Sequence, residues 1–141
     1  MDAQGSDVRW KQRFDNLQRA YQRLRWALEI HRQDPGNELI RMAVIKAYEF
    51  TFELSWKTLK DFLIYNGVDA KLPREVLKQA FATGLLNNGQ LWIDMLEERN
   101  LMAHTYDDTR ARKAVDQIQE RYLSGLQQLH DLLATKRQEA P

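Results

Sequence analysis

The 141 residues contain no cysteine and carry a net charge of only +1 at pH 7, which excludes disulfides, thiolate chemistry and the strongly basic surface typical of nonspecific nucleic-acid binding. No segment approaches the roughly eighteen apolar residues of a membrane span, and the first residues lack the basic and apolar regions of a secretory signal. We therefore expect one soluble, cytoplasmic domain over residues 1–141, long enough to bury a sizeable core.

Apolar residues with helical spacing fill the first quarter of the chain. Between residues 7 and 33 they recur in steps of four and three, which predicts a helix with one buried seam. The seam consists of Trp10, Phe14, Leu17, Tyr21, Leu24 and Leu28. Trp26 lies off this seam and is a candidate interface residue. The segment 34–37 ends the helix, and Asn37 is suited to cap the next one.

The second predicted helix, residues 38–66, is apolar on two sides, which places it centrally because such a helix contacts several neighbours. One stripe is Ile45, Tyr48, Phe52, Trp56, Leu59 and Leu63, and Ala47, Phe50 and Leu54 form the other. Glu49 and Glu53 lie four residues apart on one face. We favour a hydrogen-bonded structural or interface role for them, because no histidine is spaced to complete a metal cluster with them.

Three further helices complete the prediction: a short one from Pro73 to about 83, one over 90–103, and one from an aspartate cap at 107 or 108 to about 136. The fourth helix should bury Trp92, Met95 and Leu96. The expected fold is all-α, an antiparallel up-and-down four-helix bundle with an additional short helix. His31 and His130 lie near predicted helix ends, and we expect both at the surface.

Polar residues able to act together are concentrated in residues 98–108, where the fourth helix is expected to end. Arg99 and His104 are five residues apart, and Asn100 and His104 are four apart and would share one helix face. Arginine can bind a phosphate through two parallel hydrogen bonds, and histidine can exchange a proton near neutral pH. These two groups suffice in principle to cleave RNA at its own 2′-hydroxyl without a metal.

The string formed by Arg99, Asn100, His104, Tyr106 and Asp107 resembles the Arg-x4-His-x-Tyr signature of the HEPN superfamily. More narrowly, the chain resembles the nucleotidyltransferase substrate-binding proteins, small helical partners of minimal nucleotidyltransferases. The resemblance extends over residues 45–61, 73–76 and 91–96. It implies a helical bundle, and it implies as partners a separate minimal nucleotidyltransferase and an RNA or nucleotide ligand.

The first function that the resemblance implies is an endoribonuclease toxin without metal or cofactor, built as a homodimer whose two motifs form one site. Arg99 would bind the scissile phosphate and His104 would be the general base or acid. Asn100 and Tyr106 would bind and orient the RNA. The same resemblance implies that the nucleotidyltransferase attaches adenylate to the Tyr106 hydroxyl as an off-switch.

Two other functions stay open from the sequence. In one, the same residues form a non-catalytic module that binds a nucleotide and presents it to the transferase. That transferase would be another protein, because this chain lacks the Gly-Ser and paired-aspartate pattern of such an enzyme. In the other, the motif merely joins the fourth helix to the fifth.

Overall fold

The computed structural model describes residues 3–104 and 107–139, apart from the side chains of residues 3, 4 and 104. Within these residues the chain is helical, with no strand. The elements are α1 (Ala3–Gln33), α2 (Glu38–Tyr65), α3 (Pro73–Ala82), α4 (Gly89–His104), α5 (Asp108–Gln117), the π-helical turn η1 (Ile118–Tyr122) and α6 (Leu123–Glu139). This confirms the predicted all-α class. None of the described helices is long and apolar enough to cross a membrane.

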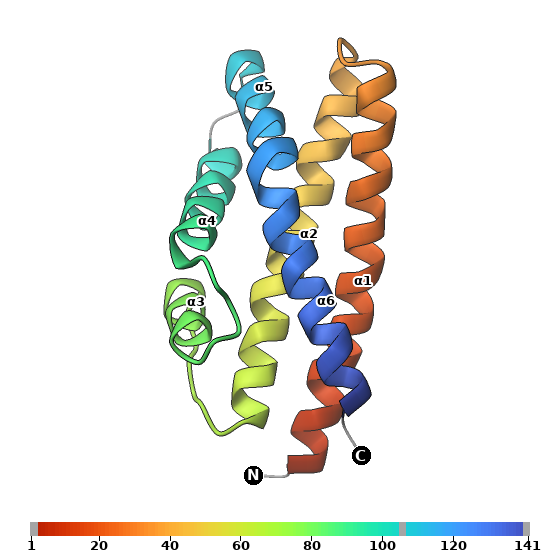
Figure 1. The fold of residues 1–141 in the computed structure, drawn as a ribbon. Coiled ribbons are helices and arrows are strands. Elements are labelled where there is room, and N and C mark those ends of the chain that lie inside the picture. The colour runs from red at the N-terminus through yellow and green to blue at the C-terminus, as the bar shows by residue number, and fades with distance from the viewer. Residues whose placement is uncertain (1–2, 105–106, 140–141) are drawn as a thin grey trace.

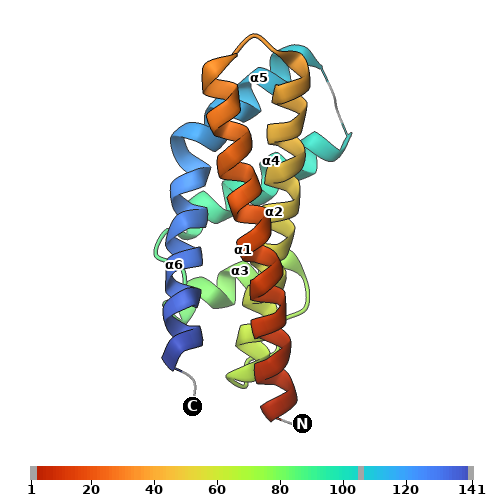
Figure 2. The ribbon, with the colours of Figure 1, turned by 90° about the vertical axis from the view of Figure 1, so that its right-hand side faces the viewer.

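The helices form an up-and-down bundle. In Figure 1, α1 and α4 rise towards one end of the molecule, and α2 and the rod made of α5, η1 and α6 descend from it. Figure 2 shows that α4 lies obliquely across the long helices and that the short α3 lies beside it. The end of α4, which carries Arg99, thus lies outside the pair formed by the long helices α1 and α2.

Local sequence signals set the helix ends. The Asn37 side chain accepts hydrogen bonds from the amides of Leu39 and Ile40, at 3.0 and 3.2 Å, as expected of an N-cap. Gly67, shortly after α2, has a φ of 82°, a left-handed conformation that favours glycine. At the start of α5 the Asp107 carboxylate accepts from the Arg110 amide at 2.8 Å. Of the two aspartates considered, Asp107 is thus the cap.

The α2 helix lies at the centre of the bundle and contacts α1, α3, α4, α5 and α6, as its two-sided apolar pattern predicted. Its Tyr48 side chain stacks on Phe52 and on Tyr122 of η1, and its hydroxyl donates to the Met95 carbonyl of α4 at 2.9 Å. The predicted seams form the core, which includes the buried side chains Trp10, Phe14, Phe52, Trp56, Trp92, Met95 and Leu96.

Three positions differ from the sequence-based expectation. His31 is buried at the end of α1 and lies in a cavity with Arg41 and Val115, because α5 packs over this end of the bundle. His130 is also largely covered, since its ring stacks on Tyr21 at 5.0 Å. Phe50 is 56% exposed, so the second stripe of α2 is only partly covered. Trp26 is 67% exposed, as its position off the seam suggested.

Phe52→Ala is expected to lower the free energy of unfolding by about 3–5 kcal/mol, because Phe52 is fully buried and its loss leaves a cavity between α2 and α4. Urea unfolding followed by circular dichroism measures this change. Phe81→Ala is the matched control, since it removes the same side chain from an exposed site on α3. Equal stabilities of the two variants would contradict the placement of Phe52.

Candidate functional site

Arg99 lies on α4 and joins this helix to α2. Its Nη2 donates to the Glu53 carboxylate at 2.7 Å, and its Nη1 donates to the Asn100 side-chain oxygen at 2.9 Å. The Arg99 side chain is 28% exposed, so its guanidinium is held by two partners and still reaches solvent. Two of the predicted site residues, Arg99 and Asn100, are therefore in direct contact.

Glu53 is a site residue whose contact with Arg99 the sequence did not reveal, since 46 residues separate the two. Burial raises the pKa of the Glu53 carboxyl, but the hydrogen bond and charge of Arg99, aided by Lys57, lower it by more, so that the net pKa lies below its usual value. A lowered pKa means that the stability contributed by ionised Glu53 is present above its ordinary pKa and is lost as the pH falls through the lowered one. At neutral pH the carboxylate is thus ionised and pairs with Arg99.

His104 is the last residue of α4, so Arg99 and His104 are carried by one continuous helix. Five residues correspond to about 7.5 Å along the helix axis and about 140° around it. Asn100, four residues before His104, lies on the same helix face as its Cα. The His104 side chain and all of Tyr106 lie outside the described residues, so the roles predicted for them remain predictions.

Two ion pairs fix the chain on either side of residues 105–106. Before this segment, the buried Glu98 carboxylate of α4 accepts from the Arg110 guanidinium of α5 at 2.6 Å. After it, Asp108 accepts from Nη1 of Arg41 at 2.8 Å, and the Arg41 side chain is only 5% exposed. The ends of α4 and α5 are therefore tied to each other and to α2.

A family model described as "Nucleotidyltransferase substrate binding protein like" matches residues 12–135, which include the Arg99–His104 motif. The chain belongs to this family. The match confirms the family that the motif suggested, and it covers most of α1 and α6 and all of the helices between them.

Three relatives illustrate the likeness. A protein named probable ribonuclease HepT from Haemophilus influenzae is 30% identical over 81 residues, which cover 54% of this chain and 56% of that protein. A crystal structure of a Thermus thermophilus protein is 28% identical with a TM-score of 0.70, covering 84% of this chain and 98% of that one. A tri-AMPylated HEPN toxin of Shewanella oneidensis, in complex with an MNT antitoxin, has a TM-score of 0.73 and 14% identity over 89% and 96% of the chains. At 14% identity the last likeness shows the fold alone.

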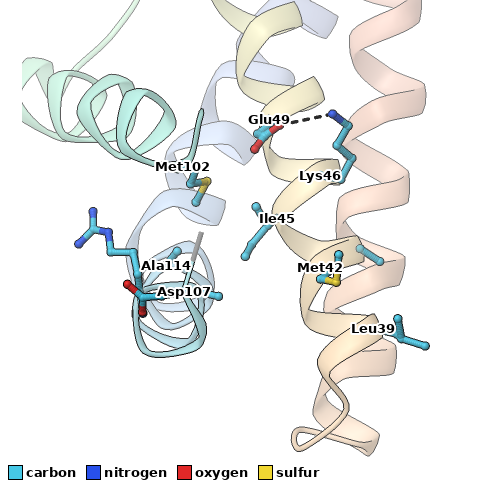
Figure 3. A pocket seen from close by; sticks show the side chains of 11 residues that line it. Leu39, Met42, Ile45, Lys46, Glu49, Met102, Asp107 and Ala114 are labelled. Carbon is cyan, nitrogen blue, oxygen red and sulfur yellow. Dashed lines mark hydrogen bonds and ion pairs between the residues drawn. The ribbon is translucent and has the colours of Figure 1, made fainter. Parts of the chain in front are cut away.

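In this member of the family, a pocket of about 510 Å³ adjoins the end of α4, the helix that carries Arg99 and His104. It lies between α2, the end of α4 and the start of α5, and Figure 3 shows Met102 and Ile45 on opposite sides of it. Most of its lining is apolar, and its charged members are Lys46, Glu49, Asp107 and Arg110. Sequence periodicity could not reveal this pocket, because its walls come from three helices.

Asp108→Asn is expected to lower the free energy of unfolding by about 1.5–3 kcal/mol, because it leaves the buried Arg41 guanidinium without a charged acceptor. Arg112→Gln is the matched control. Arg112 also pairs with the Asp108 carboxylate, at 2.9 Å, but its side chain is 64% exposed and it lies only four residues after Asp108 on α5. The loss of Arg112 should therefore lower the free energy of unfolding by about 0.5 kcal/mol or less. Urea unfolding compares the two variants, and equal losses would contradict a special role for the buried pair.

Proposed function

We propose that this protein is the HEPN-type toxin subunit of a two-component system and cleaves RNA without a metal, and that its partner is a separate minimal nucleotidyltransferase. The observation that carries the proposal is the placement of Arg99 and His104 on one helix, with the Arg99 guanidinium braced by Glu53 and Asn100 and still open to solvent. The relative named a probable ribonuclease supports the same function.

In the proposed reaction the RNA supplies its own nucleophile. The 2′-oxygen attacks the adjacent phosphorus as its proton is removed, the bond from phosphorus to the 5′-oxygen breaks, and the leaving oxygen takes up a proton. The products are a 2′,3′-cyclic phosphate and a free 5′-hydroxyl. His104 moves one of these protons, and Arg99 binds the non-bridging oxygens, on which negative charge increases in the transition state.

Glu53 orients Arg99 for phosphate binding in this scheme. Its carboxylate accepts a hydrogen bond from Nη2 of Arg99 at 2.7 Å and partly neutralises the guanidinium. A bound phosphate therefore has to share the guanidinium with this carboxylate or displace it. A planar guanidinium has five N–H donors, and within the described residues two of the Arg99 nitrogens are engaged, on Glu53 and Asn100. The remaining donors let Arg99 bind a phosphate while Glu53 keeps its orientation.

The test is cleavage of a labelled RNA by purified wild-type protein in excess EDTA. The expected products carry a cyclic phosphate and a 5′-hydroxyl, and a 2′-deoxy substitution at the cleaved position should abolish cleavage. Cleavage that requires a divalent cation, or products with a free 3′-hydroxyl, would overturn the proposed chemistry.

A second candidate function is a non-catalytic nucleotide-binding subunit that presents its ligand to the transferase. The pocket of about 510 Å³ beside the motif favours it, since its volume lies within the range of about 300–1,000 Å³ usual for small-molecule sites. Nucleotide binding by wild-type protein that never cleaves RNA would support this function over the first.

We propose further that two copies pair with α4 near the two-fold axis, so that two motifs contribute to one cleft. One arginine and one histidine are few for the two proton transfers of the reaction, and two-fold pairing doubles them. The exposed apolar side chains Phe50 on α2 and Leu101 on α4 support this assembly, because each lies within three residues of the Glu53–Arg99 pair.

Sedimentation equilibrium is expected to give a mass of about twice 16.7 kDa at micromolar concentration. Leu101→Lys should shift the equilibrium towards monomer by placing a charge in an apolar contact, and cleavage should fall with it. Val8→Lys is the control, since Val8 is equally exposed but lies on α1. A monomeric wild type with full nuclease activity would contradict the paired site.

The partner's proposed action is adenylylation of Tyr106. The phenol oxygen attacks the α-phosphorus of ATP and loses its proton, and pyrophosphate leaves. The family to which the chain belongs and the fold that it shares with a tri-AMPylated HEPN toxin support this step.

A further inference from the structure

A second pocket, of about 420 Å³, lies at the end of the bundle where α1 passes into α2. Figures 1 and 2 both place α5 beside this turn, and α2 and α5 are in contact. The polar and charged side chains that line the pocket are His31, Arg41, Arg112 and Asp116. It shares no lining residue with the apolar pocket beside α4, and the nuclease chemistry proposed above makes no use of it.

A buried guanidinium forms part of the wall of this pocket. The Arg41 side chain is only 5% exposed, and a charge so far removed from water requires anionic partners. Its Nη1 donates to Asp108 at 2.8 Å, whereas its Nη2 reaches only the Pro35 carbonyl, at 3.5 Å. That second distance is too long for a strong hydrogen bond. Nη2 can therefore gain a better acceptor from an anion in the pocket, which Pro35 also lines.

The Asp108 carboxylate is shared between two cations. Its second oxygen lies 2.9 Å from Nη2 of Arg112, which lines the same pocket as Arg41. Two guanidiniums and one carboxylate leave one positive charge of this cluster without a counter-charge. The Arg112 side chain is 64% exposed, so it can turn from Asp108 towards a ligand without breaking a buried contact. The cluster therefore favours an anion that both guanidiniums can bind.

His31 adds a buried polar group to the wall of the pocket. The residue is 7% exposed, and its Nδ1 has no hydrogen-bond partner among the described residues. Buried polar atoms in folded proteins are nearly always hydrogen-bonded, so an orphaned one indicates a ligand or an ordered water. A phosphate group that carries one proton can both accept and donate, and it therefore suits either tautomer of the ring.

We propose that this pocket binds the phosphate group of a small hydroxylated ester, of the chemical class of a sugar phosphate. The phosphate oxygens accept from Arg41 and Arg112, partly in place of Asp108, and lie beside the His31 ring. The Asp116 carboxylate accepts hydrogen bonds from the hydroxyl groups of the ligand. The volume of about 420 Å³ is larger than a bare phosphate ion needs and lies in the range usual for small-molecule sites.

Two other occupants fit these observations less well. A phosphodiester within an RNA strand would have to bring its flanking nucleotides to a guanidinium that is only 5% exposed. An ordered water would satisfy the Nδ1 atom of His31, but it would leave the excess positive charge of the cluster without a partner. A small anionic ester satisfies both groups.

The three histidines of the chain allow a direct test on the whole protein. In protein labelled with carbon-13 at histidine Cε1, inorganic phosphate is added in place of chloride at constant pH and ionic strength. The His31 signal is expected to shift and to reach half-saturation at about 1 mM or below. His130 is the internal control, because it stacks on Tyr21 outside the pocket and its signal should not move. Ribose 5-phosphate should bind at least about threefold more tightly, because its hydroxyls donate to Asp116.

Charge variants are expected to act in opposite directions. Arg112→Gln removes the exposed cation of the cluster and should weaken phosphate binding at least about tenfold. Asp108→Asn removes the carboxylate that competes with the ligand and should tighten binding at least about threefold. Asp94→Asn is the matched control, because it makes the same change of charge and releases Arg121, 2.8 Å away, outside the pocket. Its phosphate affinity should equal that of wild type.

Several results would overturn the inference. A His31 signal that stays unmoved, or that changes linearly up to about 50 mM phosphate, would leave an ordered water or an adventitious ion only. Equal phosphate affinity of wild type and Arg112→Gln would exclude the cluster, and this exposed variant carries the test if Asp108→Asn does not fold. Equal tightening in Asp108→Asn and Asp94→Asn would show a general effect of charge. Ribose 5-phosphate that binds no better than inorganic phosphate would exclude the ester. RNA cleavage enters none of these outcomes, so the nuclease proposal is tested separately.

Discussion

His104→Ala is expected to lower the rate of RNA cleavage by about 10²–10⁴-fold, the usual contribution of a general acid or base. The free energy of unfolding should change by about 1 kcal/mol or less, which is the size of a charge–dipole contribution at the C-terminus of a helix, and His104 is the last residue of α4. The measurement pairs single-turnover cleavage rates with urea unfolding. A bell-shaped pH profile that loses one limb in the variant would identify the proton that His104 carries.

Two further variants define the chemistry. His130→Ala removes a histidine that stacks on Tyr21 and should reduce stability without affecting cleavage below the unfolding transition. Arg99→Lys keeps the charge but loses the planar fork, so it should weaken phosphate binding and the contacts to Glu53 and Asn100 together. If His104→Ala unfolds the protein or cleaves at the wild-type rate, the histidine is structural and the nuclease proposal fails.

Most of the helical framework follows from signals local in the sequence. The four-and-three spacing from Trp10 to Leu28 predicts which side of α1 is buried, and each of these residues is in the core. Asn37, Pro73 and Asp107 predict helix starts because capping and first-turn preferences depend on the neighbouring few residues. Periodicity therefore sufficed to predict the bundle.

The contacts that build the candidate site could not be predicted in the same way. The Arg99–Glu53 and Arg41–Asp108 pairs join residues 46 and 67 positions apart, so they depend on how the helices are packed. The burial of His31 and the exposure of Phe50 have the same origin, since each depends on whether a neighbouring helix covers that face. The π-helical turn between α5 and α6 was also missed, because the apolar spacing across it looks continuous.

Adenylylation of Tyr106 is expected to silence the nuclease. Incubation with the genomic partner nucleotidyltransferase and ATP should add one or more adenylate groups to the chain, and peptide masses should place them on Tyr106. Each phosphodiester would add a negative charge seven residues after Arg99 in the chain, and that charge is expected to compete with RNA phosphate for the guanidinium and to repel the substrate. The cleavage rate should fall in proportion to the modified fraction, measured by intact mass.

Tyr106→Phe separates modification from mere complex formation. The variant keeps the aromatic ring and lacks the oxygen atom that would carry the adenylate, so it should cleave RNA and stay active after incubation with the transferase and ATP. Tyr122→Phe is the control, because it removes a tyrosine hydroxyl from a buried position in η1 and leaves the sequence of residues 99–106 unchanged. Silencing of Tyr106→Phe as complete as that of wild type would show that the partner acts by binding, and it would leave the tyrosine with a structural role at the end of the motif.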